Sequence, residues 1–297
     1  MKRNLLGAIC LSLAASIWGG MYVVSKYVLA FIPLFTLMWL RYIIAFVFLY
    51  GILKLTQRKR KKRETIKKKD WILIGWIGFI GYFISISFQF IGTKLSDAHT
   101  GALITSTTPA FIIIFAKFVL KERLTIRKVI SLVLATGGVF IVIGMDNHIG
   151  SYLYGSVLLV GASITWALLS VYVKIASKRF SILTITTYAV LFALLFTTPI
   201  MLWEIQVDTG YYQNYLIILS IIYLGLISTA GAFFLWNKGM ELMEASIGSL
   251  FFFLQPIVGS FLGWFLLSEK LDVSFFIGGI LILVAVMLVT YKKKQLS

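Results

Sequence analysis

Three polar side chains, Tyr82, Ser85 and Gln89, lie within one long apolar stretch of this 297-residue chain. Their spacing of three and four residues places them on one face of a helix. A polar group surrounded by hydrocarbon is costly, so such a face is expected to line a wet path or to bond a neighbouring helix. In the first case the three groups would contact a solute that crosses the membrane, and in the second they would hold helices together.

Two tryptophans near the middle of apolar stretches form a second candidate set. Trp18 is followed four residues later by Tyr22, and Trp166 is followed at the same spacing by Ser170. The two pairs could face each other and form aromatic walls for a substrate. Aromatic side chains also gather at membrane interfaces, but the mid-span positions of the tryptophans disfavour that alternative.

Pro109 and Pro256 each fall about halfway along an apolar stretch, where proline removes a backbone hydrogen bond and exposes a carbonyl about one turn earlier. We expect a kink at each proline, which would serve as a hinge with carbonyl ligands or as a static bend that improves packing. Hydroxyl and amide side chains precede the prolines and are candidate contacts for a polar solute: Thr105, Ser106, Thr107, Thr108 and Gln255.

Arg41 is the one guanidinium well inside an apolar stretch, about 10 Å from its outer end at 1.5 Å per residue. It could bind a substrate carboxylate or extend its charged end outward to the interface. It could also brace the fold by binding backbone carbonyls, which is the interpretation we favour. His99 begins another stretch, where its imidazole could couple transport to protons or simply be solvated. Trp236, which matches Gln89 in the second half of the chain, completes the candidate path.

Residues typical of covalent catalysis and metal binding are sparse. Cys10 is the only cysteine, His99 and His148 are the only histidines, and the acidic residues are scattered singly with none near the middle of an apolar stretch. We therefore expect no metal, no cofactor and no enzyme, although an enzyme acting on a lipid-linked substrate is the alternative from another class. A scaffold that binds anionic lipid through the basic segment Lys54 to Lys69 is a further alternative.

The composition places these residues in a membrane protein. Hydrophobic residues make up 60% of the chain and charged residues 13%, whereas soluble domains carry roughly a quarter charged residues. The mean hydropathy is +0.94. Ten apolar stretches are long enough to span a bilayer: Leu5 to Leu29, Phe35 to Leu53, Trp71 to Gly92, His99 to Val119, Ile126 to Gly144, Tyr154 to Ile175, Ile182 to Trp203, Tyr215 to Trp236, Ala245 to Leu267 and Val273 to Tyr291.

The basic residues predict how the chain is oriented. When alternate loops are counted, 24 of the 28 lysines and arginines fall on one side. Because cytoplasmic loops are enriched in these residues, both termini of a multi-pass protein in the cell membrane are predicted to be cytoplasmic. The net charge of +17 could suggest nucleic acid, but the charges lie between apolar stretches. The expected partners are the lipid bilayer and a small-molecule substrate.

The second half of the chain repeats landmarks of the first. At an offset of 147 residues, eight positions superpose, among them Gly92 on Gly239 and Pro109 on Pro256. Residues 1–147 and 148–297 are therefore predicted to form two repeats of five helices. Because five is an odd number of spans, the second repeat must enter the membrane from the opposite side to the first. The predicted fold is therefore all-α and integral to the membrane, with ten transmembrane helices as two inverted five-helix repeats. Many secondary transporters have this architecture.

An acidic turn recurs near the end of each repeat, with Glu122 in the first and Glu269 in the second. Each acid could be a gate or a proton site. The alternative, which we favour, is a turn residue at the membrane interface, because each turn precedes a good N-cap residue for the next helix.

Taken together, these motifs resemble the EamA family of the drug/metabolite transporter superfamily over nearly the whole chain. The resemblance implies ten helices with cytoplasmic termini, export or exchange of small metabolites such as amino acids, and a central cavity lined mainly by helices 1, 3, 4, 6, 8 and 9. Substrates differ widely within the family, so a multidrug exporter is the alternative. The resemblance is carried by Trp18 with Gly19 and Lys26, by Arg41, by the stretch from Ala98 through Pro109 to Glu122 and Leu124, and by its counterpart from Ala245 through Pro256 to Glu269 and Leu271.

Overall fold

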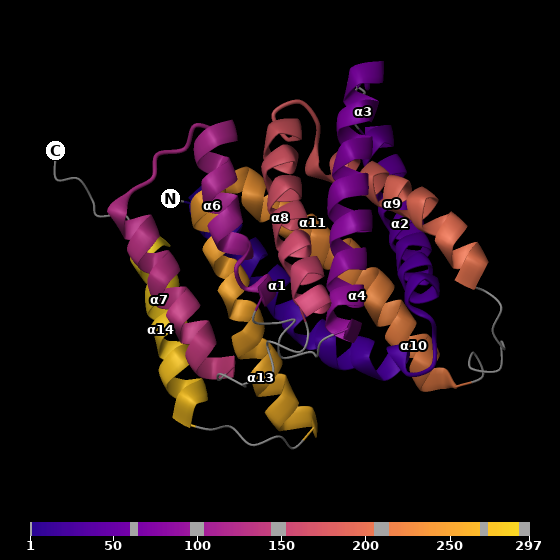
Figure 1. Ribbon diagram of the computed structural model, residues 1–297. Coiled ribbons are helices and arrows are strands. Elements are labelled where there is room, and N and C mark those ends of the chain that lie inside the picture. Colours follow the sequence, from indigo (N-terminus) through magenta and orange to yellow (C-terminus); the bar gives the residue numbers. More distant parts are fainter. Residues whose placement is uncertain are drawn as a thin grey trace.

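The computed structural model describes residues 2–59, 65–95, 104–143, 153–204, 214–267 and 273–290. Every secondary-structure element in these ranges is a helix (Figure 1). Six helical stretches of the described chain are long and apolar enough to cross a membrane, and shorter apolar helices accompany them. Four of the six are continuous helices: α1 (Lys2–Leu29), α2 (Leu34–Lys59), α8 (Leu153–Ala176) and α9 (Ile182–Glu204).

The other two long stretches each contain a π-helical segment at the matching position of the repeat. The first consists of α3 (Lys68–Ile77), η1 (Gly78–Ser85) and α4 (Ile86–Leu95). The second consists of α10 (Tyr215–Tyr223), η4 (Leu224–Gly231) and α11 (Ala232–Leu242). A π segment widens the helix and frees backbone groups from their usual partners, which is why such segments often mark functional positions.

Glycine allows the two π segments to approach their neighbours closely. A Cβ at Gly78 would lie 2.4 Å from the carbonyl oxygen of Ala189 in α9. At the equivalent position, a Cβ at Gly225 would lie 2.7 Å from the side chain of Ile44 in α2. Any larger residue would therefore push η1 away from α9, or η4 away from α2.

The shorter helices are α6 (Thr108–Val119), α7 (Ile126–Ile143), α12 (Ala245–Gly248), the 3-10 segment η5 (Ser249–Phe253), α13 (Leu254–Leu267) and α14 (Val273–Thr290). The helix is interrupted just before Pro109: Ile104 and Thr105 are helical, the next two residues form a turn, and Pro109 lies in the first turn of α6. Proline fits there since its missing N–H has no helical partner at that position. Pro256 likewise lies in the first turn of α13, directly after η5.

The two repeats exchange their first helices. Helix α1 packs on α11 and α13 of the second repeat, and α8 packs on α4 and α6 of the first. Glycines that recur in the sequence form these contacts: a Cβ at Gly239 would lie 3.0 Å from the carbonyl oxygen of Gly7, and a Cβ at Gly92 would lie 2.8 Å from that of Gly155. Small residues at such crossings let helix backbones meet in a membrane.

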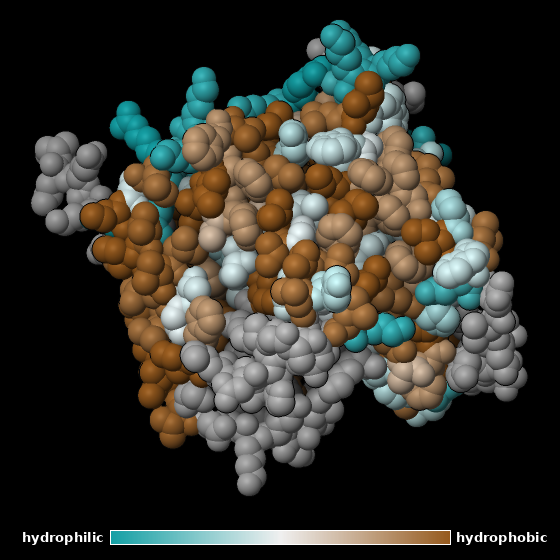
Figure 2. Space-filling model, viewed as in Figure 1, coloured by the Kyte–Doolittle hydropathy of each residue, from teal (hydrophilic) through white to brown (hydrophobic). Residues whose placement is uncertain are grey.

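The remaining pairs complete the bundle. Helix α2 packs on α9, and α7 packs on α14, so each of these contacts also joins equivalent elements of the two repeats. In Figure 1 the α7 and α14 pair forms one edge of the bundle. Figure 2 shows apolar side chains over most of the visible face, with hydrophilic side chains gathered along its upper edge where α3 begins and α6 ends.

Candidate functional site

A cavity lies between the two repeats. It is lined from α1 and α2, from the π segment η1 and α4, from the start of α6, and from α8, α11, η5 and α13. The lining residues are Trp18, Met21, Arg41, Ser85, Ile86, Gln89, Thr105, Thr108, Ala162, Ser163, Trp166, Phe233, Phe252 and Gln255. No acidic side chain is among these residues of the described chain.

Aromatic rings form the apolar wall of this cavity. The rings of Trp18 and Trp166 meet edge to face with 5.2 Å between centroids, so the first helices of the two repeats face each other here. Phe233 lies 5.7 Å from Trp166, and Phe252 lies 6.1 Å from Trp18. Such edge-to-face and tilted contacts fix the ring orientations beyond simple burial.

The two tryptophans differ in their polar contacts. Nε1 of Trp18 donates to the backbone carbonyl of Ser228 over 3.1 Å, within the π segment η4. Nε1 of Trp166 is buried and has no hydrogen-bond partner in the described chain. The repeat therefore places equivalent indoles in the cavity but satisfies only one of them.

Arg41 reaches the cavity from α2 and is 1% exposed. Its Nε donates to Oγ1 of Thr229 over 3.0 Å, and Nη2 lies 3.6 Å from the sulfur of Met21. The guanidinium also lies over the ring of Phe90, 5.9 Å from its centroid. Nη1 has no hydrogen-bond partner among the described residues. One edge of the guanidinium therefore braces α2 against η4, through a side-chain hydroxyl and not through the backbone carbonyls that the sequence interpretation named, and part of the fork is left without a partner in the described chain.

Hydroxyl groups near the start of α6 bind the backbone carbonyls that the helix leaves open. Oγ1 of Thr108 donates to the carbonyl of Thr105 over 2.6 Å, and Ser163 of α8 donates to the carbonyl of Ile104 over 3.3 Å. Ser85 of η1 donates to the carbonyl of Ala162, also in α8, over 2.8 Å. These bonds tie η1 and the start of α6 to α8.

The cavity contains six of the residues predicted to line the substrate path: Trp18, Arg41, Ser85, Gln89, Trp166 and Gln255. Six others lie elsewhere in the fold and do not line it: Tyr82, Ser106, Pro109, Ser170, Trp236 and Pro256. His99 lies outside the described residues, and so does the side chain of Tyr22, whose backbone belongs to α1.

Tyr82 belongs instead to a buried polar cluster beside the cavity. Its hydroxyl accepts from the side-chain amide of Asn237 over 2.7 Å, and the same amide donates to Thr186 over 2.9 Å. The backbone carbonyl of Tyr82 accepts from the hydroxyl of Tyr42. The Tyr82 ring stacks on Phe233 at 4.3 Å, so this cluster supports the cavity wall from behind.

Ser170 and Trp236 are joined to each other. Nε1 of Trp236 donates to the hydroxyl of Ser170 over 3.2 Å, and that hydroxyl donates to the backbone carbonyl of Trp166 over 3.0 Å. The bond between Trp236 and Ser170 connects α11 to α8. Neither residue lines the cavity, but the ring of Trp236 packs against Trp18 and Phe252, with 5.5 Å between centroids in each case, and so supports the cavity wall.

The internal repeat could have revealed lining residues that the sequence interpretation did not name. The 147-residue offset relates Ile86 to Phe233, Thr105 to Phe252 and Thr108 to Gln255, and all six line the cavity. Applying the offset to the candidate contact Thr105 would therefore have identified Phe252, whereas Ile86, the counterpart of Phe233, was not among the candidates. Met21, Ala162 and Ser163 carry no such signal.

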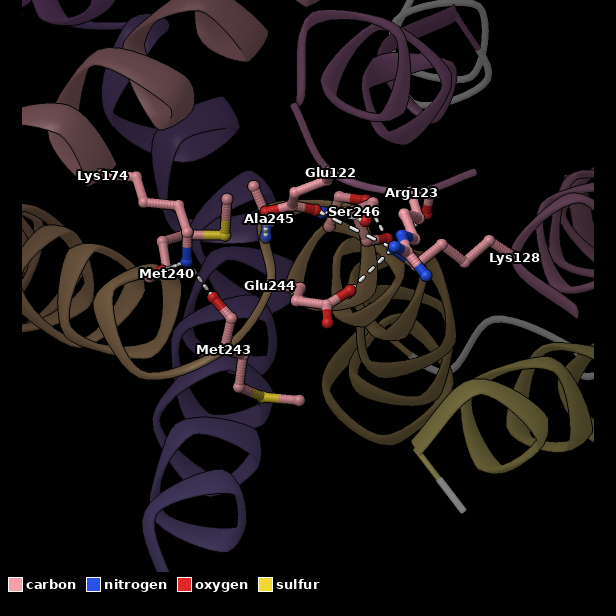
Figure 3. Close-up of polar contacts among 10 residues, drawn as sticks. Glu122, Arg123, Lys128, Lys174, Met240, Met243, Glu244, Ala245 and Ser246 are labelled. Atoms are coloured by element: carbon pink, nitrogen blue, oxygen red, sulfur yellow. Dashed lines mark hydrogen bonds and ion pairs between the residues drawn. The ribbon is translucent and has the colours of Figure 1, made fainter. Parts of the chain in front are cut away.

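A second polar assembly joins the two repeats at the end of the bundle where α6 and α8 end (Figure 3). The carboxylate of Glu122 accepts from the backbone N–H of Ala245 over 2.7 Å and from that of Ser246 over 3.0 Å. The hydroxyl of Ser246 donates to the same carboxylate. Glu122 thus caps the start of α12, where unpaired N–H groups favour a negative charge.

Lysines complete this assembly, which we call the latch: Glu122, Lys128, Lys174, Glu244 and Ser246. Nζ of Lys128, whose side chain is 4% exposed, pairs with Glu244 at 2.7 Å and lies 3.9 Å from Glu122. Nζ of Lys174 donates to the backbone carbonyl of Met240 over 2.9 Å and to that of Met243, which closes the end of α11 (Figure 3). The favoured interpretation of Glu122 as a turn residue missed this long-range role, and Glu269 lies outside the described residues.

Further contacts between the repeats lie at both ends. At the latch end, the buried carboxylate of Asp70 at the start of α3 pairs with Arg179 after α8, with a shortest separation of 2.6 Å. At the opposite end, Glu204 of α9 accepts from the backbone N–H of Thr36 over 2.7 Å and from its hydroxyl over 3.1 Å. Within the described ranges, no three His, Cys, Asp or Glu side chains come together as metal ligands would.

Comparison with known proteins assigns this architecture to a family. The model of the EamA-like transporter family matches the chain twice, over residues 5–144 and 153–291. The chain belongs to the EamA-like transporter family. Both matches together span nearly the whole sequence, so the two-repeat architecture is that of the family.

Relatives of this EamA-like chain bear the names of transporters. It is 28% identical to the uncharacterized transporter YetK of Bacillus subtilis (strain 168), covering 99% of this chain and 90% of the relative. It is 26% identical to an uncharacterized transporter of Archaeoglobus fulgidus, covering 96% and 99%. A solved crystal structure matches with a TM-score of 0.77 at 19% identity over 95% of each chain, which shows a shared fold. The chain is thus a multi-pass membrane protein of a transporter family.

Proposed function

We propose that this protein is a secondary transporter that exports small metabolites, amino acids or related compounds, through the cavity between its two repeats. The observation that carries the proposal is the cavity itself: both repeats line it, it combines aromatic walls with hydroxyl, amide and guanidinium groups, and it lies where transporters with repeated halves bind their substrates. Transport of this kind requires no covalent step, and we assign none.

The proposed topology is ten transmembrane helices in two inverted repeats, with the latch end facing the cytoplasm. Lysines and arginines at the latch end support this orientation, because α3, the turn between α6 and α7, and the turn after α8 all carry them: Lys67, Lys68, Lys69, Lys121, Arg123, Lys178 and Arg179. Both termini then lie in the cytoplasm of a cell whose plasma membrane holds the protein.

Alternating access would work by opening one end of the bundle at a time. Opening the latch end requires Glu122 to leave the start of α12 and Asp70 to part from Arg179. Opening the other end requires Glu204 to part from Thr36. Each of these contacts joins one repeat to the other, so a rocking motion of the repeats breaks them in turn.

The experiment that tests this proposal measures export directly. The purified chain is reconstituted in liposomes loaded with a mixed pool of amino acids and other small metabolites, and the loss of each solute is followed by mass spectrometry. We expect at least one solute to leave faster than from protein-free liposomes. Folded protein that speeds the loss of none of them contradicts the proposal.

A further inference from the structure

We infer that the cavity binds its substrate as a net monoanion, whose carboxylate accepts hydrogen bonds from Arg41 and Trp166. The inference rests on the proposed transport function and narrows its substrates, from amino acids and related compounds in general to those that carry one net negative charge. Two side-chain atoms of the cavity lining are buried without a partner in the described chain, Nη1 of Arg41 and Nε1 of Trp166. Both are donors, so a ligand that satisfies them must supply acceptors.

The charge of the cavity points to an anion. Arg41 is 1% exposed, and no acidic residue of the described chain pairs with it or lines the cavity. A buried charge needs a partner of opposite sign, and a carboxylate matches the planar fork of a guanidinium. A ligand with one net negative charge brings the net charge of the cavity and its ligand to zero. A zwitterion leaves that net charge at +1, because its ammonium group adds a second cation beside Arg41.

The arrangement of Arg41 holds part of the fork ready for such a ligand. Its Nε is bound to Thr229, and the hydroxyl of Thr229 in turn donates to the carbonyl of Leu224 over 2.7 Å within the π segment η4. The guanidinium is therefore oriented by Thr229 of η4 and by Met21 of α1 before any ligand arrives. Orientation of this kind lowers the cost of binding because fewer rotatable bonds are fixed by the ligand.

The tryptophan pair supplies an internal comparison. The indole N–H of Trp18 is taken by the carbonyl of Ser228, which the π segment presents, while the equivalent N–H of Trp166 has no such carbonyl. The repeat alone would treat the two indoles alike. Only Trp166 has an N–H to offer, so the carboxylate binds on the side of α8, and the rings of Trp18, Phe233 and Phe252 surround the apolar body of the substrate.

The test compares ligands that share one body and differ only in charge. Binding to the purified full chain is measured by isothermal titration calorimetry for an anion, a neutral amide, a zwitterion and an amine: 3-phenylpropionate, 3-phenylpropanamide, phenylalanine and phenethylamine. The same four charge types are measured for ligands with the side chain of leucine in place of that of phenylalanine. We expect the monoanion of at least one series to bind at least about tenfold more tightly than its amide, zwitterion and amine, which corresponds to one charge-assisted hydrogen bond.

Variants then locate the source of the preference. Arg41→Gln is expected to bring the affinity ratio of anion to amide close to one, and Arg41→Lys, which keeps the charge, is expected to restore part of it. Trp166→Phe keeps an aromatic ring without the N–H and is expected to lower the anion's affinity about tenfold with less effect on the amide's. Trp18→Phe, whose N–H is already bonded inside the protein, is expected to change both affinities by the same factor.

The outcomes separate this inference from the proposed function. The inference is overturned if the amide or the zwitterion binds as tightly as the anion, if neither series binds, or if Trp166→Phe and Trp18→Phe shift the ratio equally. Should Arg41→Gln fail to fold, the Arg41→Lys and tryptophan variants decide. Export of a neutral or zwitterionic solute without an anion preference would refute the substrate class and leave the transport proposal standing. Preferential binding of anions without any flux of solute would refute the transport proposal and leave the assignment of the ligand class standing.

Discussion

Replacing Glu122 by glutamine is expected to loosen the latch and expose the start of α12. The carboxylate, 10% exposed, accepts two backbone bonds and one hydroxyl bond, two of them at the single oxygen Oε2. A glutamine can keep one acceptor but must turn its NH₂ toward a group that also donates. Hydrogen bonds to charged groups contribute roughly 1.5–3 kcal/mol each, and water at this end replaces part of the loss.

We therefore expect Glu122→Gln to weaken the closed latch by about 2 kcal/mol, or about 30-fold in the local opening equilibrium. Hydrogen exchange followed by mass spectrometry measures this at the amides of Ala245 and Ser246, which should exchange about 30-fold faster. The matched control is Glu241→Gln, because Glu241 pairs with Lys238 only three residues away on the surface of α11 and contributes at most about 1 kcal/mol.

Unchanged exchange at Ala245 and Ser246 in the Glu122→Gln variant would refute the assignment of Glu122 as the cap of α12. Equal acceleration in the Glu241→Gln control would refute it as well, since the loss of any negative charge at this end would then explain the effect. Exchange in α10, whose N-cap Asn214 belongs to a different part of the fold, serves as the reference within each sample.

Two further substitutions test the packing of the repeats. Gly78→Ala is expected to lower the unfolding temperature, at a cost of about 1–3 kcal/mol, because the added Cβ would meet the backbone of α9. Gly137→Ala in α7 is the control, because a Cβ there would meet no atom of the described chain within 4 Å. It is expected to be neutral or to stabilise the protein by up to about 1 kcal/mol. Equal melting shifts in thermal unfolding would contradict the close approach of η1 and α9. Asp70→Asn is expected to destabilise the protein by about 1–2 kcal/mol because the buried amide no longer pairs with Arg179, whose side chain is 57% exposed and can be solvated. Arg179→Gln in the Asp70→Asn background should then cost little more, and additive losses would show that the two side chains are not coupled.

The sequence predicted the parts of this fold that depend on regular spacing. The apolar stretches, the recurring glycines and the mid-span tryptophans follow from hydropathy and from the repeat, and the glycines at Gly92 and Gly239 are indeed contacts between exchanged helices. Trp18 and Trp166 meet because each occupies the same position of its own repeat. Each of these features follows from a single regular pattern in the sequence, either the alternation of apolar and polar stretches or the internal repeat.

Tyr82 does not line the cavity with Ser85 and Gln89 but bonds a neighbouring helix, because the helix there is not a regular α-helix. Spacings of three and four residues define one face only at 3.6 residues per turn, and η1 (Gly78–Ser85) has wider π turns. Ser85 and Gln89 therefore line the cavity while Tyr82 turns toward Asn237. No local sequence signal marks a π segment, although glycines recur in both of them.

Long-range partners were beyond the reach of the sequence for a different reason. Glu122 binds Ser246, more than 100 residues away, and Arg41 binds Thr229 across the repeat boundary. The choice between such partners depends on which helices the fold brings together, and hydropathy does not encode this. The repeat supplies that information only for positions that match in both halves, which is how Phe252 could have been found from Thr105.

The central claim, that solute passes through the cavity between the repeats, is tested most directly by counterflow across liposomes that contain the purified chain. Ser163 lines the cavity and is 1% exposed, whereas Val157 on the same helix is 62% exposed on the outer face. The account predicts that Ser163→Phe, which fills the cavity, abolishes solute exchange while Val157→Phe retains the wild-type rate, with both proteins folded. Wild-type exchange by folded Ser163→Phe would contradict it.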